Sequence, residues 1–548
     1  MQYLCSEIKQ IAINIMSLET SYIFVTGGVV SSLGKGIISA SIGKLLQEHG
    51  YRITIQKFDP YINIDPGTLN PYEHGECYVT MDGMETDLDL GHYERFTGIH
   101  TNRNNSVTTG KIYQTVIDKE RRGDYLGKTI QVVPHITDEI KRRMLRVDDP
   151  EDYDFVITEI GGTIGDIESA PFMEAVRQLK WELGNRALSV HLTYVPYLKA
   201  AGELKTKPTQ HSVKELQGMG IQPDILILRT ELHLEESILQ KVAAFCNVSP
   251  DSVVQSEDLP SIYEVPVNMH RQGLDLAILR KLGKEAKEDD GVLSKWKNVL
   301  AMQAAATQEV TVALVGKYDL QDAYKSIRES LYIAGIYNKT KVHIKFVNSE
   351  WLTADGLEEA LGSVGGMIIC PGFGQRGIEG KILAVQYARE HDIPTFGICL
   401  GMQMMVIEFA RNVLGLSDAD SREMSATTQH NVIDIMADQK NLTRMGGTMR
   451  LGAYACRLKP DSRVRAIYGK EIVEERHRHR YEFNSQYTEA YEQAGMQCVG
   501  HNPESHLTEI VEIPTLRWFI GTQFHPEYSS TVQKPHPLFL DFIKNLKK

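Results

Sequence analysis

The 548-residue sequence lacks the apolar content of a membrane protein and the positive charge of a protein that coats nucleic acid. Its mean hydropathy of −0.26 is too polar for many membrane-spanning segments. The 59 Lys and Arg residues stand against 71 Asp and Glu, which leaves a formal net charge of −12. We therefore expect neither a membrane nor a nucleic acid as a partner, and any polyanion it binds must meet a local positive site.

Cysteine is also sparse. The seven cysteines form no Cys-x-x-Cys spacing and no Cys/His cluster of the zinc type. This usage indicates reduced thiols in a cytoplasmic protein. A secretory signal is lacking too, because Glu7 and Asn14 interrupt the N-terminal apolar stretch and no small-residue cleavage site follows. We predict that residues 1–20 form an extension, with Met16 as an alternative start.

What the sequence does contain is two series of strands and helices. In the first, the β-rich run Tyr22–Thr26 meets a glycine-rich loop, and apolar residues at helical spacing follow before the strand Arg52–Ile55. Strand, helix and strand in this order favour a doubly wound parallel sheet. Further strands of this series are expected at 154–158, 191–195 and 225–228.

A charged and then Ala/Gln-rich stretch, residues 284–308, is predicted to be a linker. Val310–Val315 begins the second series, with further strands expected at 342–346, 367–370 and 394–398. The predicted fold class is therefore α/β, with two doubly wound parallel-sheet domains at residues 21–283 and 309–548.

The glycine-rich loop GGVVSSLGKG, residues 27–36, has the composition of a phosphate-binding loop. Backbone N–H groups at the start of a helix attract anions, and Lys35 would reach the distal phosphates. The loop departs from the usual Walker pattern, because Gly36 stands where Ser or Thr is expected. The alternative interpretation is a tight turn between strand and helix.

Two carboxylates are candidate Mg²⁺ ligands for a bound nucleotide. Glu159 follows the apolar residues 155–157, so it is expected at the carboxyl end of a strand, where doubly wound folds place ligands. Asp89 belongs to an acidic string with Glu85 and Asp87, which could equally be a solvated edge. The pattern alone does not separate Asp89 from Asp87.

The segment KTKPTQHS, residues 205–212, places two lysines and several hydroxyl residues around Pro208 in an otherwise acidic protein. Such a cluster is often a solvated surface loop. Lysines and polar donors at fixed spacing also suit a triphosphate, and Lys241 could add to them.

The segment Gly397–Gly401 has the form of a nucleophile elbow around Cys399. Further along, His525 and Glu527 supply a base and a carboxylate that could orient it. The alternative is that Cys399 is a small buried hydrophobic residue.

The basic run RHRHR, residues 476–480, alternates two residue types. In a strand its arginines would share one face and its histidines the other. Because aromatic residues do not alternate with these charges, an internal anion or carboxylate clamp is favoured over a nucleic-acid site.

Together these motifs identify a resemblance to cytidine triphosphate (CTP) synthases that covers the chain from Tyr22 to its end. The motifs that carry it, in the family's order, are GGVVSSLGKG (27–36), FDPYINIDPGT (58–68), ETDLDLGHYERF (85–96), NNSVTTGKIY (104–113), EIGGTIGDIES (159–169), KTKPTQHSVKEL (205–216), GKYDLQDAYKS (316–326), GICLGMQ (397–403), RHRHRYE (476–482) and QFHPE (523–527).

The resemblance implies an N-terminal amidoligase domain joined to a C-terminal class I glutamine amidotransferase domain. Such a ligase of pyrimidine biosynthesis phosphorylates UTP with ATP. Ammonia from glutamine crosses an internal tunnel and displaces the phosphate to give CTP. It further implies Mg²⁺ as cofactor, GTP as allosteric activator, CTP as feedback inhibitor and a homotetramer with UTP sites at subunit contacts, and it leaves filament formation open.

The resemblance also implies roles for individual residues. The ATP site would comprise Ser32, Leu33, Gly34, Lys35, Gly36, Ile37 and Asp89, and the metal ligands would be Asp89 and Glu159. UTP or CTP would contact Ser31, Lys205, Thr206, Lys207, Pro208, Thr209, Gln210 and Lys241, with an allosteric CTP pocket at Asp166, Ile167 and Glu168. Cys399, His525, Glu527 and Lys35 would be catalytic, and glutamine would contact Gly372, Leu400, Gly401, Met402, Gln403, Glu423 and Arg480.

One position departs from the family pattern. Pro371 stands where a glycine is expected before the elbow, and proline has no N–H to offer an oxyanion, whereas Gly372 and Leu400 do. The motifs leave two other functions to consider: a cobyrinic or cobyric acid amide synthase, and a non-catalytic scaffold switched by nucleotide. The KTKPTQHS segment argues against the first, and the complete Cys-His-Glu set argues against the second.

Overall fold

A computed structural model describes residues 20–145, 153–287, 291–436, 439 and 447–546. The chain forms two compact units that do not follow chain order. The first unit comprises the chain up to Asp65 together with His92–Lys297, and the second comprises Pro66–Gly91 together with Asn298–Lys548. We call residues 66–91 the inserted segment. The predicted N-terminal extension, including Met16, lies outside the described residues except for Thr20.

Within the described residues, the first unit contains a seven-stranded sheet in the order β11-β10-β7-β1-β6-β2-β5. Every neighbouring pair is parallel, as predicted. The strands are β1 (Ser21–Gly27), β2 (Ile53–Asp59), β5 (Ser106–Thr108), β6 (Phe155–Ile160), β7 (Ala187–Tyr194), β10 (Ile225–Thr230) and β11 (Val253–Glu257). They include each of the strands expected from the first series.

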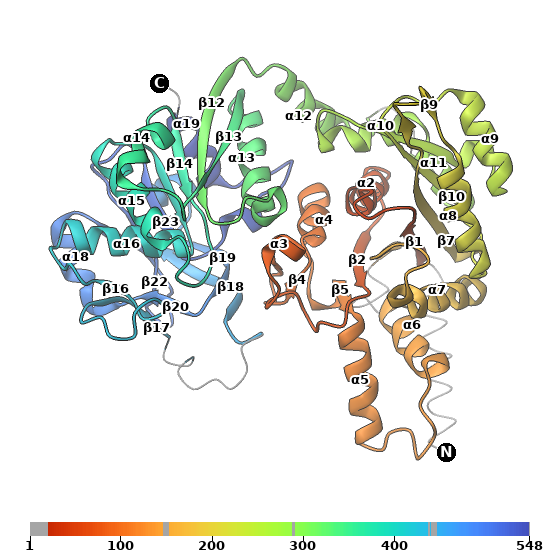
Figure 1. Cartoon of the computed structure of the whole chain (residues 1–548), viewed down its shortest axis with the longest axis horizontal. Helices are drawn as coiled ribbons and strands as arrows, with labels where there is room; N and C mark the ends of the chain where they lie inside the picture. The colour runs from red at the N-terminus through yellow and green to blue at the C-terminus, as the bar shows by residue number, and fades with distance from the viewer. Residues whose placement is uncertain (1–19, 146–152, 288–290, 437–438, 440–446, 547–548) are drawn as a thin grey trace. The chain divides into compact units, whose positions relative to one another are not determined.

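Helices cover both faces of this sheet (Figure 1). Tyr22 and Phe24 of β1 pack into one cluster with apolar residues of α5, α6 and α7, while α2, α10 and α11 contact one another beneath the other face. The helices are α2 (Lys35–Glu48), α5 (Thr109–Arg121), α6 (Thr137–Leu145), α7 (Ala170–Leu183), α8 (Lys207–Gly218), α9 (Glu236–Cys246), α10 (Val265–Arg271) and α11 (Leu274–Lys281). The elements α4 (Asp89–Thr97) and α12 (Ser294–Ala304) cross the unit boundaries.

In the described part of the second unit the main sheet has nine strands, in the order β13-β12-β14-β15-β23-β22-β21-β18-β19. It is parallel from β13 to β23, as predicted, and continues with antiparallel strands from β23 to β19, which the sequence did not indicate. Antiparallel neighbours need only short connections, whereas parallel ones need a crossover. The strands are β12 (Gln308–Gly316), β13 (Thr340–Asn348), β14 (Gly366–Ile369), β15 (Thr395–Ile398), β18 (Arg450–Leu458), β19 (Ile472–His479), β21 (Gln497–His501), β22 (Thr508–Glu512) and β23 (Phe519–Thr522).

Alternate residues of the central strands enter two separate clusters. Val312 and Leu314 pack with α13 and α19, while Ala313 and Val315 pack with α15 and α16. The helices are α13 (Lys325–Tyr337), α14 (Leu357–Leu361), α15 (Ile378–Glu390), α16 (Leu400–Asn412), α17 (Arg463–Tyr468), α18 (Thr488–Ala494) and α19 (Pro537–Leu546). A small sheet is formed by β16 (Asp420–Ser421), β17 (Asn431–Ile435) and β20 (Tyr481–Phe483).

The inserted segment contributes α3 (Pro71–His74) and a hairpin of β3 (Tyr78–Val79) and β4 (Glu85–Thr86) to the second unit. The Glu76 carboxylate accepts a hydrogen bond from the Ser326 N–H at 2.9 Å, at the start of α13. The Ala453 N–H donates to the Met81 carbonyl, also at 2.9 Å. Among the described helices, none is both long and apolar enough to cross a membrane.

Candidate functional site

In the first unit, the loop 27–36 joins β1 to α2, and Lys35 is the first residue of that helix. The backbone adopts positive φ at Val29 (78°), Ser32 (58°) and Gly34 (90°), which lets it turn sharply before the helix. The Lys35 Nζ donates to the Gly162 carbonyl at 2.7 Å. Because Gly162 follows β6, the ammonium lies at the carboxyl edge of the sheet, the expected place for a ligand.

A buried histidine connects this loop to the segment 205–212. His191 Nδ1 lies 2.9 Å from the Thr26 hydroxyl and Nε2 lies 2.8 Å from the Ser212 hydroxyl. Burial, and secondarily the charge of Lys35, lowers the pKa of His191 to about 3, so the ring is neutral. A Cβ on Gly28 would lie 1.9 Å from the Ser212 Oγ, so the two segments are in close contact.

The other predicted nucleotide residues of the first unit differ in exposure. Thr206, Thr209 and Gln210 are buried, and the Thr209 hydroxyl donates to the Tyr194 carbonyl at 2.9 Å. Lys205 is paired with Glu203. Exposed residues are Ser31, Ser32, Lys207 and Lys241, together with Asp166, Ile167 and Glu168 around a short 3-10 turn.

The predicted metal ligands lie in different units. Glu159 is the penultimate residue of β6, which ends at Ile160, so it lies at the carboxyl end of the strand as predicted, and it is fully buried. Its carboxylate accepts hydrogen bonds from the Lys57 Nζ at 2.9 Å and from the Tyr93 hydroxyl. Asp89 starts α4 in the inserted segment, so its pairing with Glu159 stays a prediction. The described residues contain no cluster of three or more His, Cys, Asp or Glu suited to a metal.

In the second unit, Cys399 stands between β15 and α16 with φ of 53° and ψ of −106°. This is a strained conformation for a residue with a side chain, and it is the geometry that the predicted elbow requires. The flanking glycines are needed for it: a Cβ on Gly397 would lie 2.8 Å from the Gly401 backbone carbon, and one on Gly401 would lie 2.0 Å from the Ile369 carbonyl oxygen.

The structure brings His525 and Glu527 together with this cysteine. His525 Nδ1 lies 2.8 Å from the Glu527 Oε1, and the ring stacks on Tyr528 at 5.0 Å. Burial alone would lower the pKa of His525, but the Glu527 carboxylate and the Cys399 sulfur raise it to about 10. Gln523 Nε2 donates to the Cys399 Sγ at 3.5 Å. A buried imidazolium is therefore held beside the sulfur.

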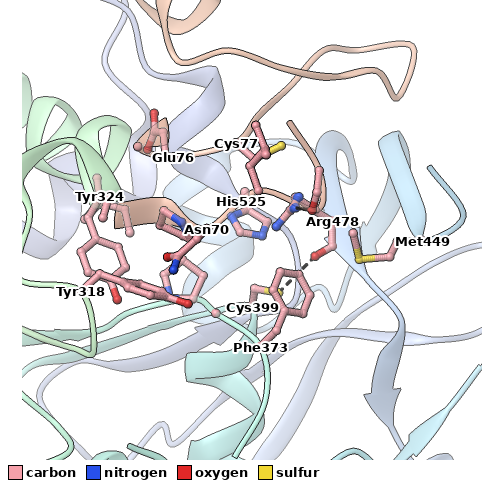
Figure 2. Close-up of a pocket in the computed structure, with 18 of the residues that line it drawn as sticks. Asn70, Glu76, Cys77, Tyr318, Tyr324, Phe373, Cys399, Met449, Arg478 and His525 are labelled. Atoms are coloured by element: carbon pink, nitrogen blue, oxygen red, sulfur yellow. Dashed lines mark hydrogen bonds between the residues drawn. The ribbon is translucent and has the colours of Figure 1, made fainter. Parts of the chain in front are cut away.

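These groups open onto a cavity of about 540 Å³ in the second unit (Figure 2). Of the residues predicted to contact glutamine, Gly372, Glu423 and Arg480 line it, whereas Leu400, Gly401, Met402 and Gln403 are buried in the first turn of α16 and are not part of the lining. Burial raises the pKa of Glu423, opposed by the Gly374 N–H and by the charges of Lys317 and Arg480.

Several lining residues were not singled out from the sequence. They are Asn70, Glu76, Cys77, Tyr318, Tyr324, Phe373 and Met449, all of them labelled in Figure 2. Asn70, Glu76 and Cys77 come from the inserted segment, more than 300 positions before Cys399. No local pattern marks such residues, since only the fold brings them to the cavity.

The basic run of β19 forms internal contacts, as predicted. Arg478 Nε donates to the Glu85 carboxylate at 2.8 Å, which confirms the expected carboxylate clamp. Arg476 instead donates to Tyr78 and to the Val79 carbonyl, both at 3.0 Å. On the other face, His477 and His479 contact each other at 3.0 Å in the buried interior.

A cysteine elbow beside a histidine and a glutamate, on an α/β unit, has the arrangement of a thiol nucleophile with its base. Consistent with this, residues 319–545 match the model of class-I glutamine amidotransferases. The glutaminase domain of a Trypanosoma brucei CTP synthase, solved with bound acivicin, is 40% identical and covers 43% of this chain and 93% of that chain, with a TM-score of 0.41. By the family match over residues 319–545, the chain joins a glutamine amidotransferase in the second unit to the α/β first unit.

The first unit shows which family of that class the chain belongs to. Residues 21–284 match the model described as the CTP synthase N-terminus. CTP synthases of Bacteroides fragilis and Porphyromonas gingivalis are 68% and 64% identical, over 96% and 97% of this chain and 99% and 98% of theirs. The chain belongs to the CTP synthase family. It is a ligase that uses ATP and glutamine to convert UTP to CTP, and the amide synthase and scaffold alternatives are not favoured.

Proposed function

We propose that the two half-reactions are divided between the two units. Glutamine hydrolysis takes place at Cys399, His525 and Glu527, and phosphorylation and amination of UTP take place at the loop 27–36 and the segment 205–212. The observation that carries this division is the cavity in which Cys399, the raised-pKa His525 and Glu527 meet. It lies within the second unit, whereas Lys35 belongs to the first.

In the hydrolysis, the Cys399 sulfur attacks the side-chain amide carbon of glutamine. The backbone N–H groups of Gly372 and Leu400 hold the oxyanion, and His525 donates its proton to the departing ammonia. Water then cleaves the glutamyl thioester. Glu423 and Arg480 carry charges opposite to those of the ammonium and carboxylate groups of an amino acid, which suits them to orient glutamine.

In the synthesis, the ATP γ-phosphoryl group is transferred to O4 of the uracil. This step turns a poor leaving group into a good one, and ammonia then displaces phosphate. Lys35 neutralises charge on the phosphates, and neutral His191 fixes the segment 205–212 beside the loop without adding a second cation.

The carboxylates of Asp89 and Glu159 are hard oxygen donors of the kind that Mg²⁺ prefers, and each oxygen of Glu159 keeps a lone pair beyond its bond to Lys57 or Tyr93. We propose that they hold Mg²⁺. When bound, the ion supplies positive charge for the nucleotide phosphates.

We also propose that GTP activates glutamine hydrolysis and that CTP inhibits at Asp166, Ile167 and Glu168. These residues are exposed and therefore open to a ligand or a neighbouring subunit. A cytoplasmic homotetramer with an internal ammonia path completes the proposal.

The test is to incubate the protein with UTP, ATP, Mg²⁺ and glutamine and to follow the ultraviolet change of the base. CTP formation that needs all four supports the proposal. Synthesis that proceeds without Mg²⁺ would remove the metal from it, and a lack of response to GTP or CTP would remove the regulatory part.

A further inference from the structure

The backbone of β19 contacts both reacting residues of the hydrolysis, His525 through its backbone N–H and Cys399 through its side chain. The His525 N–H donates to the Arg476 carbonyl at 2.8 Å, and the Cys399 Sγ lies 3.6 Å from the Arg478 carbonyl as a weak donor. Any shift of these two β19 residues would therefore move the sulfur and the imidazole relative to each other.

The side chains of the same two residues bind the inserted segment. Arg478 donates from Nε to Glu85 at 2.8 Å and from Nη2 to the Gly67 carbonyl at 2.9 Å. Arg476 donates to the Tyr78 hydroxyl and to the Val79 carbonyl. All of these residues lie within the second unit. Each arginine thus contacts a catalytic residue through its carbonyl and the inserted segment through its guanidinium.

The Glu85–Arg478 pair has little room to rearrange. Their side chains are 1% and 13% exposed, and a Cβ on Gly67 would lie 2.1 Å from the Glu85 Oε2. A buried ion pair holds one geometry because losing either partner leaves an uncompensated charge. Arg478 also lies over the ring of Phe373, 4.9 Å from its centroid, in the loop that carries Gly372.

A second contact reaches the imidazole. The Tyr528 hydroxyl donates to the Cys77 carbonyl at 3.0 Å, while its ring stacks on His525 with planes 9° apart. The inserted segment therefore supports both the cysteine and the histidine.

We infer that Glu85 and Arg478 are positioning residues for glutamine hydrolysis: they hold the Arg478 carbonyl in place under the Cys399 sulfur. Part of the glutaminase site is thus supplied by a segment whose sequence lies in the N-terminal family domain. The inference rests on the proposed function, with Cys399 as nucleophile.

The test compares Glu85→Gln, which removes the charge and keeps the shape, with the intact chain. We expect kcat for glutamine-dependent synthesis to fall ~10- to 100-fold, because small misplacements of reacting atoms have effects of this size. The KM for glutamine and the ammonia-dependent rate should stay within about twofold, since Glu85 is not among the residues that line the cavity and ammonia does not need the cysteine.

Glu408→Gln is the matched control. Glu408 is fully buried and pairs with Arg389 at 2.8 Å in the same unit, and it has no contact with β19 or the inserted segment among its hydrogen bonds and ion pairs. Its loss should lower the melting temperature as much as Glu85→Gln does and leave glutamine turnover within twofold. A turnover loss equal to that of Glu85→Gln would mean that Glu85 acts only through stability, which would overturn the inference.

The rate of Cys399 alkylation by iodoacetamide, read by peptide mass spectrometry to separate it from Cys77, gives a second measurement. In Glu85→Gln the alkylation rate should fall in parallel with kcat. Arg478→Lys should keep more of the alkylation rate and of kcat than Arg478→Met does. If Glu85→Gln does not fold, the comparison of Arg478→Lys with Arg478→Met decides. Equal losses of kcat and of alkylation rate in these two variants would overturn the inference.

Cys399→Ala, measured beside these variants, separates a failure of the proposed function from a failure of the positioning inference. If it keeps glutamine-dependent synthesis, the proposed function fails. If Cys399→Ala loses glutamine-dependent synthesis while Glu85→Gln keeps the wild-type rate, only the positioning inference fails. It also fails alone if Glu85→Gln loses ammonia-dependent synthesis as much as it loses glutamine-dependent synthesis.

Discussion

Each of the two units buries a histidine beside its candidate site, and the pKa values of the two imidazole rings shift in opposite directions. Burial lowers the pKa of His191 to about 3, with Lys35 adding to the effect, whereas Glu527 and Cys399 raise the pKa of His525 to about 10. Desolvation acts on both, so the neighbouring charge decides the outcome. The first unit keeps a neutral ring beside the proposed phosphate loop, and the second keeps a protonated ring beside the proposed nucleophile.

This difference matches the two chemistries. Phosphoryl transfer needs fixed positive charge and no competing acid, whereas amide cleavage needs a thiolate and a proton donor at once. The predictions below alter one unit at a time, beginning with the largest expected effect.

Lys35→Ala should reduce CTP formation from either glutamine or ammonia by about 10³-fold or more, because positive charge at a transferring phosphoryl group has effects of this size. Activity with both nitrogen sources and the melting temperature are the measurements. Normal ammonia-dependent synthesis in this variant would remove the loop 27–36 from the active site.

Glu527→Gln should lower glutamine hydrolysis by about 10²-fold or more, because the histidine loses its orienting charge. The pKa of His525 should fall as well, so the alkaline limb of the pH–rate profile should move to lower pH. In the wild type the folded pKa of about 10 lies above the unfolded value of ~6.5. Protonation therefore stabilises the fold fully below pH ~6.5 and is lost as pH rises towards 10.

The free energy of unfolding, measured between pH 6.5 and 10, checks the predicted pH dependence of stability. The wild type should lose more unfolding free energy over this range than Glu527→Gln does. Equal losses would mean that Glu527 does not set the charge of His525.

Gly28→Ala should reduce synthesis from both nitrogen sources by about tenfold, because its Cβ would lie 1.9 Å from the Ser212 Oγ and must displace α8 from the loop. Adding Ser212→Gly should restore part of the rate. Steady-state kinetics with ammonia measure both variants, and a double variant no better than the single one would show that the contact with Ser212 is not the cause.

Pro371→Gly should have the smallest effect, a change of a few-fold in glutamine hydrolysis. If Gly372 and Leu400 already supply the oxyanion donors, another N–H adds little. A true donor is worth ~10²–10³-fold, so a gain of that size would show that the glycine usual in the family donates.

The same comparison shows what the sequence could predict. The strands of both series follow from short-range hydrophobic periodicity, and the structure contains them. The elbow at Cys399 follows from its flanking glycines, which stand where a side chain would collide with neighbouring backbone. Glu159 lies at the carboxyl end of β6, as its place after an apolar run predicts, although the strand continues one residue further to Ile160. Apolar runs do not distinguish parallel from antiparallel neighbours, which is why the antiparallel half of the second sheet was missed.

The supporting residues of the cavity could not be predicted. Glu85 reads as part of an acidic string, and Arg478 as part of a basic run, and nothing local indicates that they pair across 393 positions. The inserted segment joins the second unit only through its tertiary contacts. Long-range pairing of this kind depends on the whole fold.

The most direct test of the central claim, that hydrolysis and synthesis occupy separate sites, is the activity of Cys399→Ala with two nitrogen sources. Glutamine-dependent CTP formation should vanish. The same protein should still make CTP from concentrated ammonium salt at pH 8 or above, where more of the ammonia is unprotonated, at a rate within about twofold of the wild type. Loss of both activities in a protein that still unfolds cooperatively would contradict separate sites, and retention of both would show that Cys399 is not the nucleophile.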